Sequence, residues 1–188
     1  YKQAYFTFFI MGGKKVLVVD VDETLLNIEP LFFLKRFKKD YPSYDGELVN
    51  FSSKRYYMVP RPRIREFLEK ARNFDLIAFS VVNRDITIQK LEILGIKNFF
   101  VKIYGKEDLI NKKKSLKMVS EDLNIPINNI IAIDDMPGIF MESSNIIPVK
   151  PFLMGKNDEY EYQEHDDNLL GAINQALKQG IKVVSPVD

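Results

Sequence analysis

The sequence predicts an α/β protein in which helices cover a mostly parallel β-sheet. Two observations predict this class: short, β-rich apolar runs recur along the chain, and segments with the helical spacing of apolar residues lie between them. The runs are apolar at successive positions, which is typical of strands buried on both faces. At 188 residues, the chain has a suitable length for one hydrophobic core. We therefore expect residues 1–188 to form a single domain.

The apolar runs give the positions of the expected strands, which are 16–19, 76–79, 99–103, 130–133 and 146–149. The region at 27–58, directly after the first of these strands, has a different character. It is aromatic and basic, and Pro and Gly residues interrupt it. We expect this region to be an insertion that folds over the edge of the sheet, with a short helix and a hairpin.

Helical patterns lie between the strands. Pro62 suits a first helical turn, and the apolar stripe that follows consists of Ile64, Phe67, Leu68 and Ala71. Two further helices are expected at 85–94, where Gly95 acts as a stop, and at 114–123. A last helix is expected to begin near Asp166, an acceptable N-cap. Its predicted buried residues are Leu169, Leu170, Ile173 and Leu177.

The composition excludes several classes of site. The chain has no cysteine, which rules out disulfides, thiol catalysis and cysteine-ligated metals and fits an intracellular protein. The one histidine, His165, rules out a multi-histidine metal site and is expected to be a surface residue. The net charge is +1, so bulk electrostatics predicts neither nucleic-acid binding nor membrane binding.

No apolar run approaches the length of about 18 residues that is needed to cross a bilayer. The longest apolar stretch near the start is AYFTFFIM at 4–11. It lacks a clear small-residue cleavage site, so we expect a flanking strand, or a leader before a start at Met11, rather than a signal-peptide core.

The strongest functional signal is the sequence VLVVDVDETLL, in which a buried strand ends in acidic residues. Residues two apart in an extended chain project to the same side, so Asp20 and Asp22 can both face a pocket at the carboxyl end of the sheet. Two carboxylates this close repel each other unless a cation lies between them or one is protonated. Asp20 can then act as a metal ligand and as a nucleophile towards phosphorus, while Asp22 transfers protons. The alternative, a solvated acidic turn, is less compatible with the buried strand before it.

The motif DVDETLL resembles the first motif of the haloacid dehalogenase superfamily, in the DxDxT form of its phosphatases. It is most similar to the FCP/SCP-like branch, whose members act on the C-terminal domain of RNA polymerase II. Two other segments, YYMVPRPRIREFLEKA and NIIPVKPF, also resemble that branch. The resemblance extends from Lys15 to about Leu177, and it implies a haloacid dehalogenase-like sheet.

The resemblance implies a role for three more motifs. Ser80, at the end of LIAFS, would hydrogen-bond a phosphoryl oxygen. A lysine of the run 112–114 would neutralise phosphoryl charge; Lys114 aligns best, and Lys113 is the second choice. The pair Asp134 and Asp135 would complete a magnesium site. The FCP/SCP-like branch more often has Asp-Asn here, so the second position departs from its pattern.

The implied mechanism has two steps. Asp20 attacks phosphorus and also binds Mg²⁺, to which Asp22 contributes its backbone carbonyl. Asp135 would be the direct ligand if it replaces the usual Asn, with Asp134 bonded to Lys114. Asp22 protonates the departing alcohol and then activates the water that hydrolyses the aspartyl phosphate. Thr24, Ser80 and Lys114 are expected to contact the substrate.

The expected substrate is a phosphoserine or phosphothreonine protein, with polymerase tails as one candidate. The stretch between Ser80 and Lys114 is too short for a large cap domain, and such caps usually accompany small substrates. The aromatic insertion offers Phe32, Phe33 and Phe37, with Arg36 nearby, as peptide contacts.

Three alternatives remain open: a phosphatase of small metabolites, an inactive phosphopeptide-binding scaffold, and a receiver domain, against which the motif order argues. The protein is expected to be a monomer without nucleic-acid or membrane partners. Arg61 and Arg63, on either side of Pro62, are expected to be solvated charges.

Overall fold

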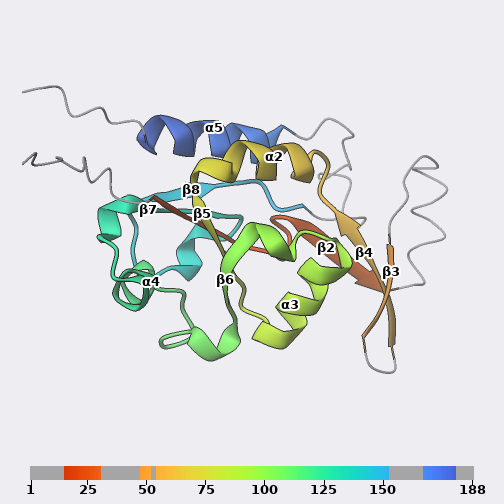
Figure 1. Cartoon of the computed structure of the whole chain (residues 1–188). Helices are drawn as coiled ribbons and strands as arrows, with labels where there is room; N and C mark the ends of the chain where they lie inside the picture. Colours follow the sequence, from red (N-terminus) through yellow and green to blue (C-terminus); the bar gives the residue numbers. More distant parts are fainter. Residues whose placement is uncertain (1–14, 31–46, 52–53, 153–166, 181–188) are drawn as a thin grey trace, which may run out of the picture.

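Five parallel strands form the central sheet of the computed structural model, in the order β6-β5-β1-β7-β8 (Figure 1). The structure describes residues 15–30, 47–51, 54–152 and 167–180. The strands are β1 (Val16–Val19), β5 (Asp75–Phe79), β6 (Phe100–Tyr104), β7 (Ile130–Asp134) and β8 (Ile146–Pro148). The five strands predicted between residues 16 and 149 are confirmed, with bounds that differ by at most one residue at either end. The stretch 4–11, for which a flanking strand or a leader is expected, lies outside the described residues.

Strand β1 lies at the centre of the sheet, and all four of its residues are fully buried. It pairs in parallel with β5 on one side and with β7 on the other, so that Val19 lies opposite both Ala78 and Ile133. Asp20, the next residue, therefore emerges beside the ends of both neighbours. This register places the acidic strand end at the carboxyl edge of the sheet, where open α/β folds bind their ligands.

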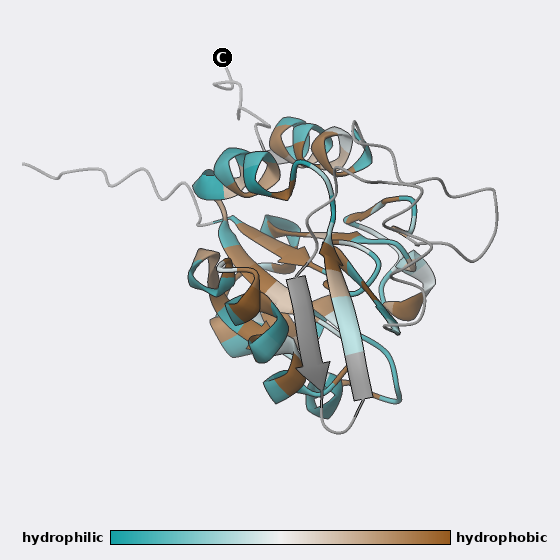
Figure 2. Ribbon diagram, turned by 90° about the vertical axis from the view of Figure 1, so that its right-hand side faces the viewer, coloured by the Kyte–Doolittle hydropathy of each residue, from teal (hydrophilic) through white to brown (hydrophobic). Residues whose placement is uncertain are grey.

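Helices cover both faces of the sheet. Their bounds are α2 (Ile64–Lys70), α3 (Arg84–Ile93), α4 (Leu116–Leu123) and α5 (Asn168–Gly180). Helices α2 and α5 lie side by side above the sheet in Figure 1, with α4 on the opposite side. The two faces hold separate apolar cores, because alternate residues of β1 point to α2 and α5 or to α4. In Figure 2 the strands of the central sheet are largely brown, whereas teal residues lie on the outer sides of the helices.

In the described part of the chain, the connections contain five single-turn 3-10 helices: η1 (Ala71–Asn73), η2 (Lys97–Phe99), η3 (Lys106–Asp108), η4 (Ile127–Asn129) and η5 (Pro137–Ile139). The predicted stripe of α2 is buried, including Ala71 in η1. Helix α3 ends at Ile93, and Gly95 has the positive φ of 63° that a helix stop favours. Helix α4 begins two residues later than predicted, because the hydroxyl of Ser115 caps it by accepting the Met118 N–H at 3.2 Å.

The last helix begins at Asn168, and Asp166, its predicted N-cap, lies outside the described residues together with His165. Leu169, Leu170 and Ile173 are buried as predicted, and Leu177 packs against the same core while partly buried. Within the described ranges, no helix is both long enough and apolar enough to cross a membrane.

A second, antiparallel sheet has the order β2-β4-β3. Its strands are β2 (Leu26–Pro30), β3 (Glu47–Phe51) and β4 (Lys54–Pro60), so it contains the described residues of the 27–58 region. The described residues of this region contain no helix. Residues 31–46, with Phe32, Phe33, Arg36 and Phe37, and residues 52–53 lie outside the described residues. Strand β2 follows directly from the acidic loop after β1, so the two sheets meet at the predicted site.

Candidate active site

The acidic loop after β1 is a closed turn that is built from its own backbone. The N–H of Asp20 continues the sheet by donating to the carbonyl of Ile133 at 2.9 Å. The N–H groups of Leu25 and Leu26 both donate to the carbonyl of Val21, which closes the loop. Glu23 adopts a φ of 61°, a left-handed conformation that reverses the chain within this short loop. The loop therefore holds Asp20 and Asp22 at a sharp turn instead of continuing as a strand.

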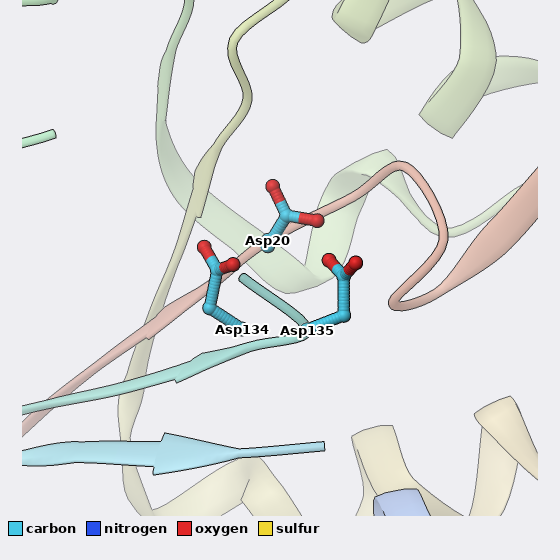
Figure 3. A group of neighbouring side chains, drawn as sticks. All are labelled: Asp20, Asp134 and Asp135. Carbon is cyan, nitrogen blue, oxygen red and sulfur yellow. The ribbon is translucent and has the colours of Figure 1, made fainter. Parts of the chain in front are cut away.

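Three carboxylates converge at the edge of the sheet. Asp20 comes from the end of β1, Asp134 is the last residue of β7, and Asp135 follows it (Figure 3). One oxygen of each lies within 4.8 Å of the other two. Carboxylate oxygens from separate elements, facing one point, are the donor set that Mg²⁺ takes in proteins, where it also keeps several waters. These three residues therefore fit a magnesium ion.

Burial makes this cluster unfavourable without a positive charge. The pKa of Asp20 is raised to about 7: burial raises it most, Lys114 opposes this, and repulsion from Asp134 and Asp22 adds to it. Burial also raises the pKa of Asp134 and that of Asp135. A divalent cation would favour the ionised carboxylates, so the electrostatics of the cluster agree with its geometry.

Lys114 supplies one positive charge to the cluster. Its Nζ lies 2.5 Å from Asp20 Oδ1 and 2.7 Å from Asp134 Oδ2, and its side chain is fully buried. The ammonium also lies over the rings of Phe79 and Phe140, at 5.8 and 5.6 Å from their centroids. Burial alone would lower the pKa of Lys114, but the two carboxylates outweigh it and raise that pKa. Lys114 therefore stays charged in an apolar surrounding.

A tight turn decides which lysine of the run enters the site. Ile110 and Lys113 exchange backbone hydrogen bonds of 2.9 Å in both directions. The two residues between them, Asn111 and Lys112, have φ values of 50° and 63°, as in a type I′ turn. Lys112 and Lys113 are exposed on this turn, and Lys114 is the first residue that points inward. The structure thus brings Lys114, the preferred candidate, to Asp20 and leaves Lys113 outside.

Glu142 fixes the backbone around Lys114. Its carboxylate accepts hydrogen bonds from the N–H groups of Leu116 and Lys117 and from the hydroxyl of Ser115, at 2.9 to 3.0 Å. The neighbouring segment also holds Lys114 directly, because the N–H of Met141 donates to its carbonyl at 2.9 Å. Burial alone would raise the pKa of Glu142, but these hydrogen bonds outweigh it and lower that pKa. Glu142 thus caps the first turn of α4 from a distant part of the chain.

We expect Glu142→Gln to remove a pH-dependent part of the stability. Because the pKa of Glu142 is lowered in the folded protein, its contribution is present above the ordinary value of 4.5 and is lost as the pH falls below it. The melting temperatures of the wild type and of E142Q should therefore differ at pH 7 and converge towards pH 3. A difference that stays constant across this range would show that the charge of Glu142 does not act through these hydrogen bonds.

The carboxylate of Asp22 is not one of the three that converge; residues after β5 and on α3 hold it. Its Oδ2 accepts a hydrogen bond of 3.0 Å from the hydroxyl of Ser80, and Ser80 in turn accepts the N–H of Val82. Its Oδ1 lies 2.5 Å from the Nζ of Lys90. The sequence interpretation missed Lys90. The available signal was its place between Thr87 and Leu91 on the face of the helix that packs inward, where a lysine is unusual.

Thr24 was expected to contact the substrate, but its hydroxyl is bonded to Asp135. It is fully buried, and its hydroxyl donates to Asp135 Oδ1 at 3.1 Å and accepts the Asp135 N–H at 3.2 Å. Thr24 therefore links the acidic loop to the end of β7 and orients one of the three carboxylates. This arrangement requires a short hydroxyl side chain at that place.

The expectation that Arg61 is a solvated charge is wrong. Only 2% of Arg61 is exposed, and its guanidinium donates to the carbonyls of Thr24 at 3.1 Å and of Lys150 at 2.9 Å. It also lies over the ring of Phe152. Arg61 therefore joins the acidic loop to the chain after β8. Arg63 is exposed as expected, and it pairs with Glu66 and Asp167.

We expect Arg61→Met to destabilise the protein by about 3 kcal/mol, because it leaves two carbonyls without their charged donor. The melting temperature should fall by about 6–12 °C at this chain length. Arg63→Met is the matched control, since its ion pairs are largely exposed and their loss should leave the melting temperature almost unchanged. Thermal unfolding of both variants checks this, and an equal loss in the two would contradict the role of Arg61.

Comparison with known proteins gives one family match and one similar curated sequence. Residues 15–184 match the family described as NLI interacting factor-like phosphatase. A phosphatase of the RNA polymerase II C-terminal domain, from Caenorhabditis elegans, is 25% identical over 188 residues. The match covers 89% of this chain and 28% of that protein, so the chain spans less than a third of this relative.

Solved structures share the fold. The fission yeast RNA polymerase II CTD phosphatase Fcp1, bound to beryllium fluoride, superposes with a TM-score of 0.62 at 16% identity, covering 88% of this chain and 52% of that one. A haloacid dehalogenase-like family hydrolase from Xanthomonas campestris gives a TM-score of 0.54 at 10% identity, covering 89% and 97%. At these identities the likeness concerns the fold, and it confirms the predicted haloacid dehalogenase-like class.

Proposed function

Because the chain belongs to the NLI interacting factor-like phosphatase family, we propose that it is a magnesium-dependent phosphatase that works through an aspartyl phosphate on Asp20. The observation that carries the proposal is the cluster of Asp20, Asp134 and Asp135 around one point, with Lys114 against two of them. Phosphoryl transfer depends mainly on positioning and on charge stabilisation, and this cluster offers both.

Asp20 is the proposed nucleophile. One of its oxygens is held by Lys114, which leaves the other to approach phosphorus. Attack forms a bond between this oxygen and phosphorus and breaks the bond from phosphorus to the substrate alcohol. Mg²⁺, bound by Asp20, Asp134, Asp135 and the backbone carbonyl of Asp22, would supply charge that offsets the phosphoryl oxygens. The ammonium of Lys114 offsets the charge of the nucleophile.

Asp22 is the proposed acid and base. It lies two residues from Asp20 on the same loop, and its side chain is 28% exposed, so a substrate can reach it. In the first step it gives a proton to the departing alcohol, and in the second it takes a proton from water. That water breaks the bond between phosphorus and Asp20 and releases inorganic phosphate. The hydroxyl of Ser80 donates to Asp22 in this structure, and we propose that it donates to a phosphoryl oxygen instead once the substrate is bound.

The proposed substrate is a protein that carries phosphoserine or phosphothreonine. The family match supports this class, and so does the Caenorhabditis elegans relative, which is a phosphatase of a polymerase C-terminal domain. Such a domain is one candidate substrate. The second aspartate of the pair, Asp135, keeps a small phosphorylated metabolite as the second candidate, because the FCP/SCP-like motif more often ends in Asn.

A substrate panel tests the proposal. Phosphoserine and phosphothreonine peptides and small phosphorylated metabolites are compared by phosphate release, with Mg²⁺ or with EDTA. We expect kcat/KM for the best peptide to exceed that for the best metabolite at least about tenfold, and we expect EDTA to stop turnover until Mg²⁺ is restored. A preference for metabolites would favour the second candidate, and peptide binding without any phosphate release would identify a scaffold.

A further inference from the structure

Lys90 is a buried lysine that the proposed mechanism does not use. It lies on α3, and its side chain is 4% exposed. Thr87 and Leu91, on the same face of the helix, are fully buried. An apolar residue would cover this face at lower cost, because a buried ammonium must be paired to compensate for lost hydration. The presence of a lysine here therefore needs a reason beyond packing.

The partner of Lys90 is the carboxylate of Asp22. The Nζ of Lys90 lies 2.5 Å from Asp22 Oδ1, while the hydroxyl of Ser80 lies 3.0 Å from Asp22 Oδ2. The two donors come from different elements, the end of β5 and the middle of α3. Each oxygen is thus held from a separate direction, and a carboxylate held at both oxygens cannot turn about its own axis. Asp22 sits on a closed loop that also fixes its backbone.

We propose that Lys90 is a positioning residue, which holds the carboxylate of Asp22 for its proton transfers. This inference rests on the proposed function. The two steps of the reaction depend on this positioning to different degrees. In the first step the substrate is already fixed by its phosphoryl group. In the second step the attacking water is oriented mainly by the carboxylate that takes its proton. Loss of Lys90 should therefore slow hydrolysis of the aspartyl phosphate more than its formation.

Rapid mixing with p-nitrophenyl phosphate and Mg²⁺ separates the two steps. This leaving group departs as a stable anion, so the first step needs little help from an acid. In Lys90→Met the initial burst of p-nitrophenolate should keep its rate constant within about twofold. The steady rate after the burst should fall about tenfold, a part of the 10²–10⁴-fold that a positioned acid or base contributes. The aspartyl phosphate should accumulate as a hydroxylamine-labile label.

A double-mutant cycle shows whether Lys90 acts through Asp22. In an Asp22→Asn background, Lys90→Met should change the steady rate by less than about twofold, because the group that it positions is gone. Lys97→Met is the matched control. It removes an ammonium 2.5 Å from Glu92 on the surface and should leave both phases unchanged. If K90M does not fold, as judged by its melting temperature, Lys90→Gln replaces it in the same cycle.

Three outcomes would overturn the inference alone. They are unchanged kinetics in K90M, an equal slowing of the burst and steady phases in K90M, or a double mutant whose loss of steady rate equals the product of the losses in K90M and in D22N. Absence of any turnover or labelling in the wild type with Mg²⁺ would instead overturn the proposed function, and this inference with it. The two failures are therefore distinguishable in one set of measurements.

Discussion

Asp20→Asn should reduce phosphate release at least about 1,000-fold on every substrate, because the amide oxygen cannot attack phosphorus as a carboxylate does. The variant should also take up no label from a phosphorylated substrate, whereas the wild type should form a hydroxylamine-labile aspartyl phosphate. Steady-state assays and trapping of the labelled enzyme check these two results.

Asp20→Asn should remain folded, and this makes the result interpretable. Burial raises the pKa of Asp20 to about 7, so a neutral side chain already suits its surroundings. Asn also keeps an oxygen that can accept from Lys114. Asp85→Asn is the control, since Asp85 is exposed in the first turn of α3 and should not affect turnover. If D20N and the wild type released phosphate at equal rates, Asp20 could not be the nucleophile.

Lys114→Met should lower both activity and stability. Removing a preorganised donor at developing charge costs about 10²–10³-fold in rate. Asp20 and Asp134 would also lose the ammonium that pairs with both of them, and breaking a buried ion pair costs about 3–5 kcal/mol. We expect the destabilisation to be larger at pH 8 than at pH 5, because the two carboxylates can be protonated at the lower pH. Added Mg²⁺ should restore part of the stability by supplying charge to the same cluster.

Lys113→Met is the matched control for this experiment. Lys113 is the neighbouring residue of the same run, but it is exposed on the turn, so its loss should change the unfolding free energy by less than about 0.5 kcal/mol. Melting curves at the two pH values and phosphate-release assays compare the variants. A larger effect of K113M than of K114M would contradict the assignment of the lysine.

The local pattern of the sequence was sufficient for the strands. The five runs of successive apolar residues between 16 and 149 became strands of the central sheet, because strands buried on both faces require such runs. The acidic motif after β1 was also predictable, because it ends a buried strand, and the resemblance to the haloacid dehalogenase superfamily implied the doublet after β7. Their meeting within 4.8 Å follows from the pairing of β1 with β7.

The roles of Thr24, Arg61 and Lys90 needed the tertiary structure. Thr24 and Asp135 are 111 positions apart, Arg61 and Lys150 are 89 apart, and Lys90 and Asp22 are 68 apart. The spacing of residue types within one helix or strand gives no information about contacts between positions so far apart. Next to Arg61, Pro62 and the neighbouring charged residues indicate the solvated start of a helix. The burial of Arg61 results from the approach of the chain after β8.

Spacing along single elements was enough to predict the parallel sheet and the acidic residues after its first strand, and the family resemblance implied the later motifs. Only the packed fold shows which of the neighbouring lysines enters the site and which groups hold Asp22 and Asp135. Those choices depend on the left-handed turn at Asn111 and Lys112 and on side chains that arrive from distant elements. Contacts between distant parts of the chain form only when the layers pack, and packing then selects the partner of each buried charge.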